Sequence, residues 1–202
     1  MTDSFLDKAY DYGSDTRRLY DDWAASYDAE LSKNSYVTPE RCAKALAAHM
    51  DDLAQPVLDF GCGTGLSGLA LRMQGFEVID GIDVSGDMLR KAAEKRLYRQ
   101  LHQIDPGAEL GSAPGDYAAI TCIGVIGAGA APLETFDIVM DGLAPGGLLV
   151  FSFNDHTLED PAYEARLDAY LKAGRAQLLF KEHGPHIRGR DLNANVYVIE
   201  KL

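Results

Sequence analysis

The sequence predicts an α/β fold: a three-layer, doubly wound, mostly parallel sheet of seven strands that ends in an antiparallel hairpin. A short apolar run, VLDF at 57–60, leads into glycines at alternate positions, and an apolar helical pattern follows at 66–73. A second run, rich in β-forming residues, spans 76–84 and carries Asp83 near its end. Strand, glycine loop, helix and strand in this order make one half of such a fold.

The glycine loop has the chemistry of a ligand site. Gly61, Gly63 and Gly65 lack a Cβ, so the chain can turn tightly and bring its backbone against a bound molecule. The first N–H groups of the following helix are unpaired and carry partial positive charge, which suits a carboxylate or a phosphate. Asp83, at the carboxyl end of the next strand, can accept hydrogen bonds from the two hydroxyls of a ribose. The predicted ligand therefore carries a ribose and an anionic or polar tail.

Two classes of ligand fit these features. Gly63, Gly65 and Gly68 spell G-x-G-x-x-G, which is typical of dinucleotide-binding enzymes. That pattern begins where its strand ends, however, and Gly61 already holds that place. Counted from Gly61, the third glycine of the pattern falls on Leu66. The spacing acid-x-G-x-G-x-G fits the strand end better, and a nicotinamide-dependent reductase remains the alternative.

Three segments resemble class I methyltransferases that use S-adenosylmethionine (SAM). DFGCGTG at 59–65 and GIDVSGDML at 81–89 resemble the SAM loop and the ribose-binding acid, and LAPGGLLVFSF at 143–153 resembles the turn and strand L-x-P-G-G. The resemblance implies SAM as the cofactor, with the loop at its methionine end, Asp83 at its ribose and other side chains around its adenine. The implied site residues are Asp59, Gly61, Cys62, Gly63 and Gly65 in the loop, Asp83 and Val84 at the end of the second strand, Met88 in the helix that follows it, Asp105 after the third strand and Ile123 in the fourth.

The segment YDDWAASYD at 20–28 places Tyr20, Trp23 and Tyr27 at i, i+3 and i+7, which is one face of a helix. Either these rings dock the helix on the domain, or the helix is a lid over the ligand. The segment resembles one that precedes the core of small-molecule methyltransferases, which implies that Tyr20 and Tyr27 reach the methionine end of SAM or the acceptor. We expect 1–15 to be flexible and 16–202 to form a single domain, divided into a lid segment at 16–36 and a core at 37–202.

The remaining elements complete the predicted sheet. Further strands are expected at 99–104, 117–126 and 148–153, with helices at 86–97, 132–143 and 161–173. The runs 176–182 and 195–200 predict the antiparallel hairpin with which class I methyltransferases end. HGPHIRGRD at 183–191 is expected to be the solvated loop between them.

The charge and composition of the chain argue against several classes of partner: nucleic acid, membranes and zinc. The chain has 202 residues and a formal net charge of −12, and an acidic surface repels the phosphates of nucleic acid. No apolar run approaches the length of a membrane span, and the N-terminus has no basic-then-apolar signal pattern, so we expect a cytoplasmic protein. Cys42, Cys62 and Cys122 are scattered, which indicates neither a zinc site nor a disulfide framework. The sequence does not indicate an oligomeric state.

The predicted reaction is methyl transfer from SAM to an oxygen, nitrogen, sulfur or carboxylate acceptor, and we expect that acceptor to be a small molecule. A general base is needed only where the acceptor is protonated and weakly acidic. His156 is the first candidate, because it follows the fifth strand at the ligand-binding edge, and Tyr27 is the second. A protein that binds SAM or its product without transferring a methyl group is a further alternative.

Overall fold

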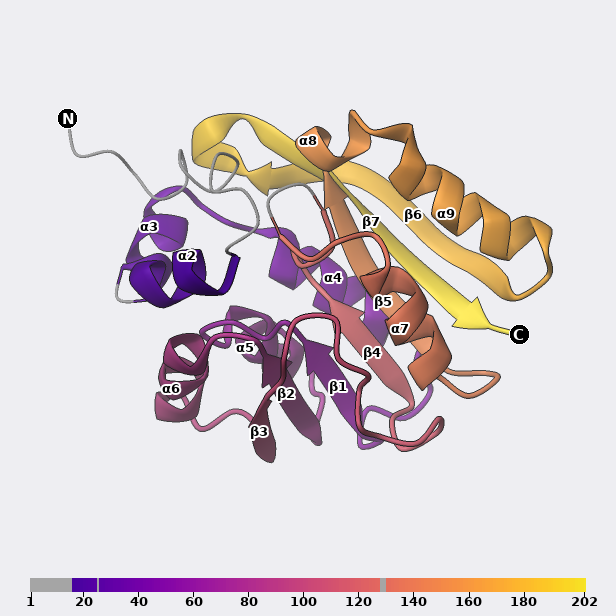
Figure 1. Cartoon of the computed structure of the whole chain (residues 1–202), viewed down its shortest axis with the longest axis horizontal. Helices are drawn as coiled ribbons and strands as arrows, with labels where there is room; N and C mark the ends of the chain where they lie inside the picture. The colour runs from indigo at the N-terminus through magenta and orange to yellow at the C-terminus, as the bar shows by residue number, and fades with distance from the viewer. Residues whose placement is uncertain (1–15, 25, 128–129) are drawn as a thin grey trace.

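The computed structural model describes residues 16–24, 26–127 and 130–202, and their strands form one sheet in the order β3-β2-β1-β4-β5-β7-β6 (Figure 1). Strands β1 to β5 run parallel, and β7 lies antiparallel between β5 and β6. The predicted fold class is therefore confirmed. The segment 1–15, expected to be flexible, lies outside the described residues. The strands are β1 Val57–Phe60, β2 Ile79–Asp83, β3 Gln100–Gln103, β4 Ala119–Cys122, β5 Leu148–Asn154, β6 Ala176–Ile187 and β7 Leu192–Lys201.

Helices cover both faces of the sheet, which is why its central strands are buried on both sides. α4 (Thr38–Ala47) and α5 (Leu66–Met73) pack on one face, and α7 (Thr135–Gly142) and α9 (Pro161–Lys172) pack on the other. Every residue of β1 and β4 is buried, as parallel strands between two helical layers require. Within the described residues, no helix is both long and apolar enough to cross a bilayer.

α6 (Gly86–Glu94) begins where the sequence predicts. Ser85 has an extended backbone, and its hydroxyl accepts the N–H of Met88 at 3.1 Å. Asp87 lies in the first turn, where a negative charge stabilises the helix dipole. This cap fixes the direction in which the chain leaves β2.

The lid segment forms two helices, so the single helix predicted there is wrong. α2 spans Thr16–Trp23 and α3 spans Tyr27–Lys33. Ser26 precedes α3, and Asp28 and Glu30 lie in its first turn, a pattern that favours the start of a new helix. The break brings Tyr27 edge-on to the buried ring of Trp23, with ring centroids 4.6 Å apart.

Strand lengths also differ from the predictions. β4 ends at Cys122 rather than near 126, because Gly124 takes a φ of +70° and turns the chain out of the sheet. β6 continues to Ile187, so His183 and His186 belong to a strand and not to a loop. Pro185 fits there because β6 is an edge strand, where a missing N–H breaks no ladder on the outer side.

The far end of β6 joins the lid segment to the core. Tyr36 forms an antiparallel bridge with Ile187, and the Val37 N–H donates to the His186 carbonyl at 3.0 Å. His186 is 6% exposed, and its Nδ1 lies 2.8 Å from Thr38 Oγ1. Burial, together with the positive charge of Arg41, lowers the pKa of His186 to about 4, so the ring is neutral at physiological pH. A neutral ring suits this hydroxyl contact.

Candidate functional site

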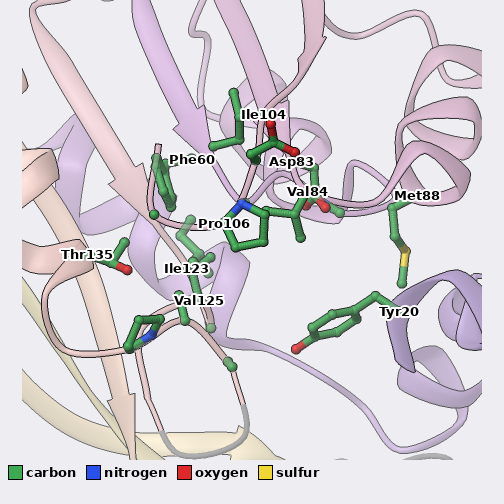
Figure 2. Close-up of a pocket in the computed structure, with 18 of the residues that line it drawn as sticks. Tyr20, Phe60, Asp83, Val84, Met88, Ile104, Pro106, Ile123, Val125 and Thr135 are labelled. Atoms are coloured by element: carbon green, nitrogen blue, oxygen red, sulfur yellow. The ribbon is translucent and has the colours of Figure 1, made fainter. Parts of the chain in front are cut away.

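A pocket opens at the carboxyl ends of β1, β2 and β4, where ligands bind in open α/β sheets (Figure 2). It is an open cleft whose lining is mostly apolar with a few polar side chains, as is usual for small-molecule sites. Figure 2 shows Tyr20 and Met88 across the pocket from Thr135. The lining residues are Tyr20, Tyr27, Phe60, Gly61, Gly63, Asp83, Val84, Met88, Ile104, Asp105, Pro106, Gly107, Ile123, Gly124, Val125, Ala130, Ala131, Pro132 and Thr135.

Asp83 is the best-fixed polar group of the pocket. Its Oδ2 accepts the N–H of Gly63 at 2.8 Å, and its Oδ1 accepts the N–H of Ser85 at 2.9 Å. The residue is only 8% exposed, and burial raises the pKa of its carboxyl group. Each carboxylate oxygen has a second lone pair, so Asp83 can still accept hydroxyl donors from a ligand.

The three glycines of the loop face different surroundings. A Cβ on Gly61 would lie 2.5 Å from a methyl of Val125, so this position is closed by packing. A Cβ on Gly65 would lie 3.2 Å from the ring of Tyr98. At Gly63, which has a φ of +53°, a Cβ would meet nothing within 4 Å. Of these three, Gly63 is therefore the one that leaves space for a ligand.

Asp59, in β1, and the loop residues Cys62 and Gly65 are not among the pocket-lining residues. Asp59 is fully buried and accepts the hydroxyls of Ser67 at 2.6 Å and of Thr121 at 2.7 Å. Burial raises the pKa of the Asp59 carboxyl and of the Cys62 thiol. These positions support the loop from beneath, and any effect they have on a ligand passes through it.

α2 is held against the rim of the pocket by two polar contacts. Arg17 Nη2 lies 3.0 Å from Asp105 Oδ1, and the Ser85 hydroxyl donates to Asp21 Oδ1 at 2.5 Å. The Asp105 side chain is 86% exposed, so its pair with Arg17 is screened by solvent. Asp105 therefore lies at the mouth of the pocket rather than at its floor.

α3 contacts the back of the glycine loop. Lys95 Nζ lies 2.7 Å from Asp28 Oδ2 and donates to the Thr64 carbonyl at 2.6 Å. The Thr64 hydroxyl also donates to Asp28. Asp28, Thr64 and Lys95 thus join the lid segment, the loop and α6. No sequence pattern indicates this group, because its members lie far apart in the chain.

The two candidates for a general base lie in different places. Tyr27 lines the pocket, and burial, with the nearby groups Tyr36, Tyr20 and Asp83, raises the pKa of its phenol well above the usual value. Tyr27 therefore stays protonated at neutral pH and can donate a hydrogen bond. His156 lies in the short helix α8 (Asp155–Leu158), outside the pocket lining, with its Nδ1 3.6 Å from Glu159 Oε1.

The other predicted residues lie in the lining. Val84, Met88 and Ile123 contribute apolar surface to the pocket, as the resemblance implies, and Tyr20 enters from α2. Four more residues line the pocket although the sequence did not predict it: Phe60, Ile104, Pro106 and Thr135. In a sequence, an apolar side chain at the end of a strand cannot be told from a core residue. Only the position of Ile104 and Pro106 on either side of Asp105 indicated a place at the site.

Comparison with known proteins places the chain in a family. The family described as "Methyltransferase domain" matches residues 31–196. Methyltransferase-like protein 27 of Homo sapiens is 32% identical over 162 residues, covering 77% of this chain and 66% of that protein. A ubiquinone biosynthesis O-methyltransferase of Methylococcus capsulatus is 29% identical over 152 residues, covering 73% of this chain and 61% of that protein. An 18S rRNA (guanine-N(7))-methyltransferase of Arabidopsis thaliana is 40% identical over 76 residues, covering 38% of this chain and 26% of that protein.

A solved structure shares the fold. The magnesium protoporphyrin IX methyltransferase of Synechocystis PCC 6803, solved with bound SAM, superposes with a TM-score of 0.68 at 17% identity and covers 95% of this chain and 99% of that one. The chain spans at most 66% of the length of the three curated relatives above. The match over 31–196 covers most of the sequence, and it agrees with the resemblance of the glycine loop. The chain therefore belongs to the methyltransferase domain family.

Proposed function

We propose that this protein is a SAM-dependent methyltransferase whose acceptor is a small molecule. One observation carries the proposal most directly. A buried carboxylate at the end of β2, Asp83, is hydrogen-bonded to Gly63 of the glycine loop, and both residues line one pocket. This arrangement places acceptors for ribose hydroxyls beside a stretch of backbone that a ligand can approach.

The lining of the pocket suits SAM in chemistry. It combines apolar walls with a few polar side chains, as a nucleoside with an amino-acid tail requires. Asp83 would hold the ribose, and Val84, Met88 and Ile104 would contact the adenine. The open space beside Gly63 would receive the methionine end. Asp105, at the mouth of the pocket, would accept a hydrogen bond from the exocyclic amine of adenine.

When bound, SAM supplies a methyl group that its sulfonium makes electrophilic. The part left to the protein is to hold donor and acceptor together and to keep water out. Tyr20 and Tyr27 reach the pocket from the lid segment, so the lid contributes to that enclosure. The protonated phenol of Tyr27 is a hydrogen-bond donor to whichever molecule lies beside it. His156 as a base stays a prediction, and a His156→Ala variant with unchanged turnover would remove it.

The acceptor side of the pocket supports a small apolar acceptor. The wall formed by Val125, Ala130, Ala131 and Pro132 is apolar, and the net charge of −12 opposes the binding of a phosphate backbone. The relative named for ubiquinone biosynthesis points to a small acceptor, and the relative named for rRNA points to the other class. The cytoplasmic location and the division into 1–15 and 16–202 also stay predictions.

Thermal unfolding with candidate ligands tests the cofactor. A ligand that binds only the native state at 100 times its Kd stabilises it by about 2.7 kcal/mol. We expect SAM and its product S-adenosylhomocysteine (SAH) to raise the Tm, and NADH and NADPH to leave it unchanged. A rise with the nicotinamide cofactors alone would establish the reductase alternative.

Methyl-labelled SAM then tests transfer and acceptor class. We expect label to appear in small-molecule fractions and not in rRNA. Label in rRNA would replace the proposed acceptor. Bound SAM with no transfer to either class would favour a SAM-binding protein without transferase activity.

A further inference from the structure

Tyr98, which lies between α6 and β3, fills the space beneath the glycine loop. A Cβ placed on Gly68 would come within 2.3 Å of the Tyr98 hydroxyl oxygen, and one on Gly81 would come within 3.0 Å of the Tyr98 ring. Gly65 faces the same ring at 3.2 Å. These three glycines therefore form a slot for a tyrosine side chain. Gly65 and Gly68 are the second and third glycines of the G-x-G-x-x-G spacing that is typical of dinucleotide sites. Here they leave room for the Tyr98 side chain, not for a dinucleotide.

The Tyr98 hydroxyl connects the two sides of the loop. It donates to Asp59 Oδ2 at 2.7 Å, at the strand that enters the loop, and it accepts the Gly68 N–H at 3.1 Å, in the helix that leaves it. The N-cap of α5 is Gly65, which has no side chain to accept the first N–H groups of that helix. Tyr98 supplies the acceptor that the N-cap lacks.

The opposite side of the loop is held by Asp83, through the Gly63 N–H. The loop is thus fixed between a carboxylate on the pocket side and a phenol beneath it. Burial and the neighbouring Asp59 raise the pKa of Tyr98, so the phenol is protonated and can donate at neutral pH. Asp59 is also hydrogen-bonded to Ser67 and Thr121, which makes it a firm anchor for that phenol.

We propose that Tyr98 is a positioning residue, which holds the backbone of the glycine loop where it can bind the amino-acid end of the cofactor. This inference rests on the proposed function, since it assumes that SAM occupies the pocket. Tyr98 is not among the pocket-lining residues, so it acts through the loop and not by contact with the ligand.

Two ligands separate positioning from simple stability. SAH has an amino-acid end and adenosine lacks one, while both carry the base and the ribose. Tyr98→Phe keeps the ring in its slot and removes only the two hydrogen bonds. By calorimetry we expect this variant to bind SAH about tenfold more weakly and adenosine within about twofold of the wild-type affinity.

Tyr197 provides a matched control. Its hydroxyl also donates to a carboxylate, Glu164 Oε1 at 2.7 Å, and accepts an N–H, from Asn195 at 2.9 Å, but it lies in β7 and not at the pocket. Tyr197→Phe should lower the Tm and leave the ratio of SAH to adenosine affinity unchanged. If Tyr98→Phe is too unstable to measure, Asp59→Asn removes the carboxylate that accepts the phenol, and it should selectively weaken SAH in the same way.

The outcomes are distinct. Selective loss of SAH affinity in Tyr98→Phe or Asp59→Asn, and not in Tyr197→Phe, supports the positioning role. Equal loss for SAH and adenosine, or no loss for either, overturns it while leaving the proposed function in place. A wild-type protein that binds neither ligand overturns the proposed function itself.

Discussion

The two halves of the sheet bury different chemistry. Around β1, β2 and β4 the buried groups include the carboxyls of Asp59 and Asp83 and the hydroxyl of Thr121. Around β5 and β7 the core is aromatic, with Phe151 stacked on Tyr197 at a centroid distance of 4.7 Å. One sheet therefore combines a half with buried carboxyl groups, which carries the pocket, with an aromatic half that does not carry it.

This difference shows where the fold tolerates unfavourable burial. Desolvation of a carboxylate costs free energy even when hydrogen bonds compensate part of it, and burial raises the pKa of both Asp59 and Asp83. The aromatic half has no such cost and contributes dispersion and hydrophobic stabilisation instead. Stability and ligand binding should therefore be separable by mutations in the two halves.

The largest effect is expected in the aromatic half. Phe151→Ala removes a fully buried ring that contacts Phe136, Phe153 and Tyr197. We expect the free energy of unfolding to fall by about 3–5 kcal/mol in denaturant titrations. The affinity of the folded protein for SAH should not change, and a large loss of affinity would show that the two halves are not separable.

The next largest effect is expected at Asp83. Asp83→Ala removes the acceptor proposed for the ribose, so SAH binding should weaken by about 1–3 kcal/mol in calorimetry. Asp80 is the matched control, because it is buried in the same strand but pairs with Arg99, with its Oδ1 2.9 Å from Arg99 Nε, and does not line the pocket. Asp80→Ala should destabilise the fold and leave SAH affinity intact. Equal losses in both variants would remove the ribose role of Asp83.

Acidic pH should separate binding from stability at the same residue. The pKa of Asp83 is raised in the folded protein, so the folded state takes up a proton first as the pH falls. As the pH falls through the folded pKa of Asp83 towards its unfolded pKa, its contribution to folding stability therefore rises. Over the same range its ability to accept hydrogen bonds from ribose hydroxyls falls, because the carboxylate becomes protonated. We expect SAH affinity to decline as the pH falls through the raised pKa of Asp83, and Asp83→Asn to flatten the part of the decline that Asp83 causes. An unchanged profile in that variant would assign the decline to another group.

The pKa of Asp80 is shifted in the opposite direction, so its contribution to stability depends on pH in the opposite way. Hydrogen bonds from Arg99 and Tyr117 lower its pKa despite its burial. Its stabilising contribution is therefore present above the pKa of the unfolded chain and is lost as the pH falls through the lower, folded value. Asp80→Asn should reduce the loss of stability in acid, as measured by circular dichroism, without changing the pH dependence of SAH binding.

The smallest effect is expected where the lid segment meets the loop. Lys95→Met removes a partly buried pair with Asp28, which should cost about 1 kcal/mol or less. We expect SAH to dissociate about two- to fivefold faster in stopped-flow measurements, with little change in Tm. Lys91→Met is the control, since Lys91 lies on the same helix and pairs with the exposed Glu94. A faster dissociation in both variants would point to the charge of α6 and not to the lid contact.

The sequence was most informative where the structure is local. The strand before the loop, the glycines, the cap at Ser85 and the acid at Asp83 lie within 30 positions of one another, and each follows from the conformational preferences of a few neighbouring residues. The break in the lid also had a local signal, at Ser26. The spacing of Tyr20, Trp23 and Tyr27 predicts one continuous helix, however, and that prediction ignores the signal at Ser26.

The parts that could not be predicted depend on contacts between distant residues. Tyr98 meets Asp59 across 39 positions, and Asp28 meets Lys95 across 67. No short pattern marks such pairs, because the sheet order and not the local sequence brings them together. The sequence predicts a ligand contact for Gly65, and Gly68 belongs only to the alternative dinucleotide spacing, but the side chain of Tyr98 faces both glycines.

The attachment of the lid segment to β6 limits how the pocket can be uncovered. Backbone hydrogen bonds tie residues 34–37 to 186–189, among them Gly189 N–H to the Asn34 carbonyl at 2.9 Å. One of these bonds reaches the end of β6, and two come from the 3-10 helix η1 (Arg188–Arg190) that follows it, so breaking them would loosen the edge of the sheet. A movement of α2 and α3 that admits a ligand should therefore have its hinge on the N-terminal side of Asn34, while residues 34–37 stay attached to the core.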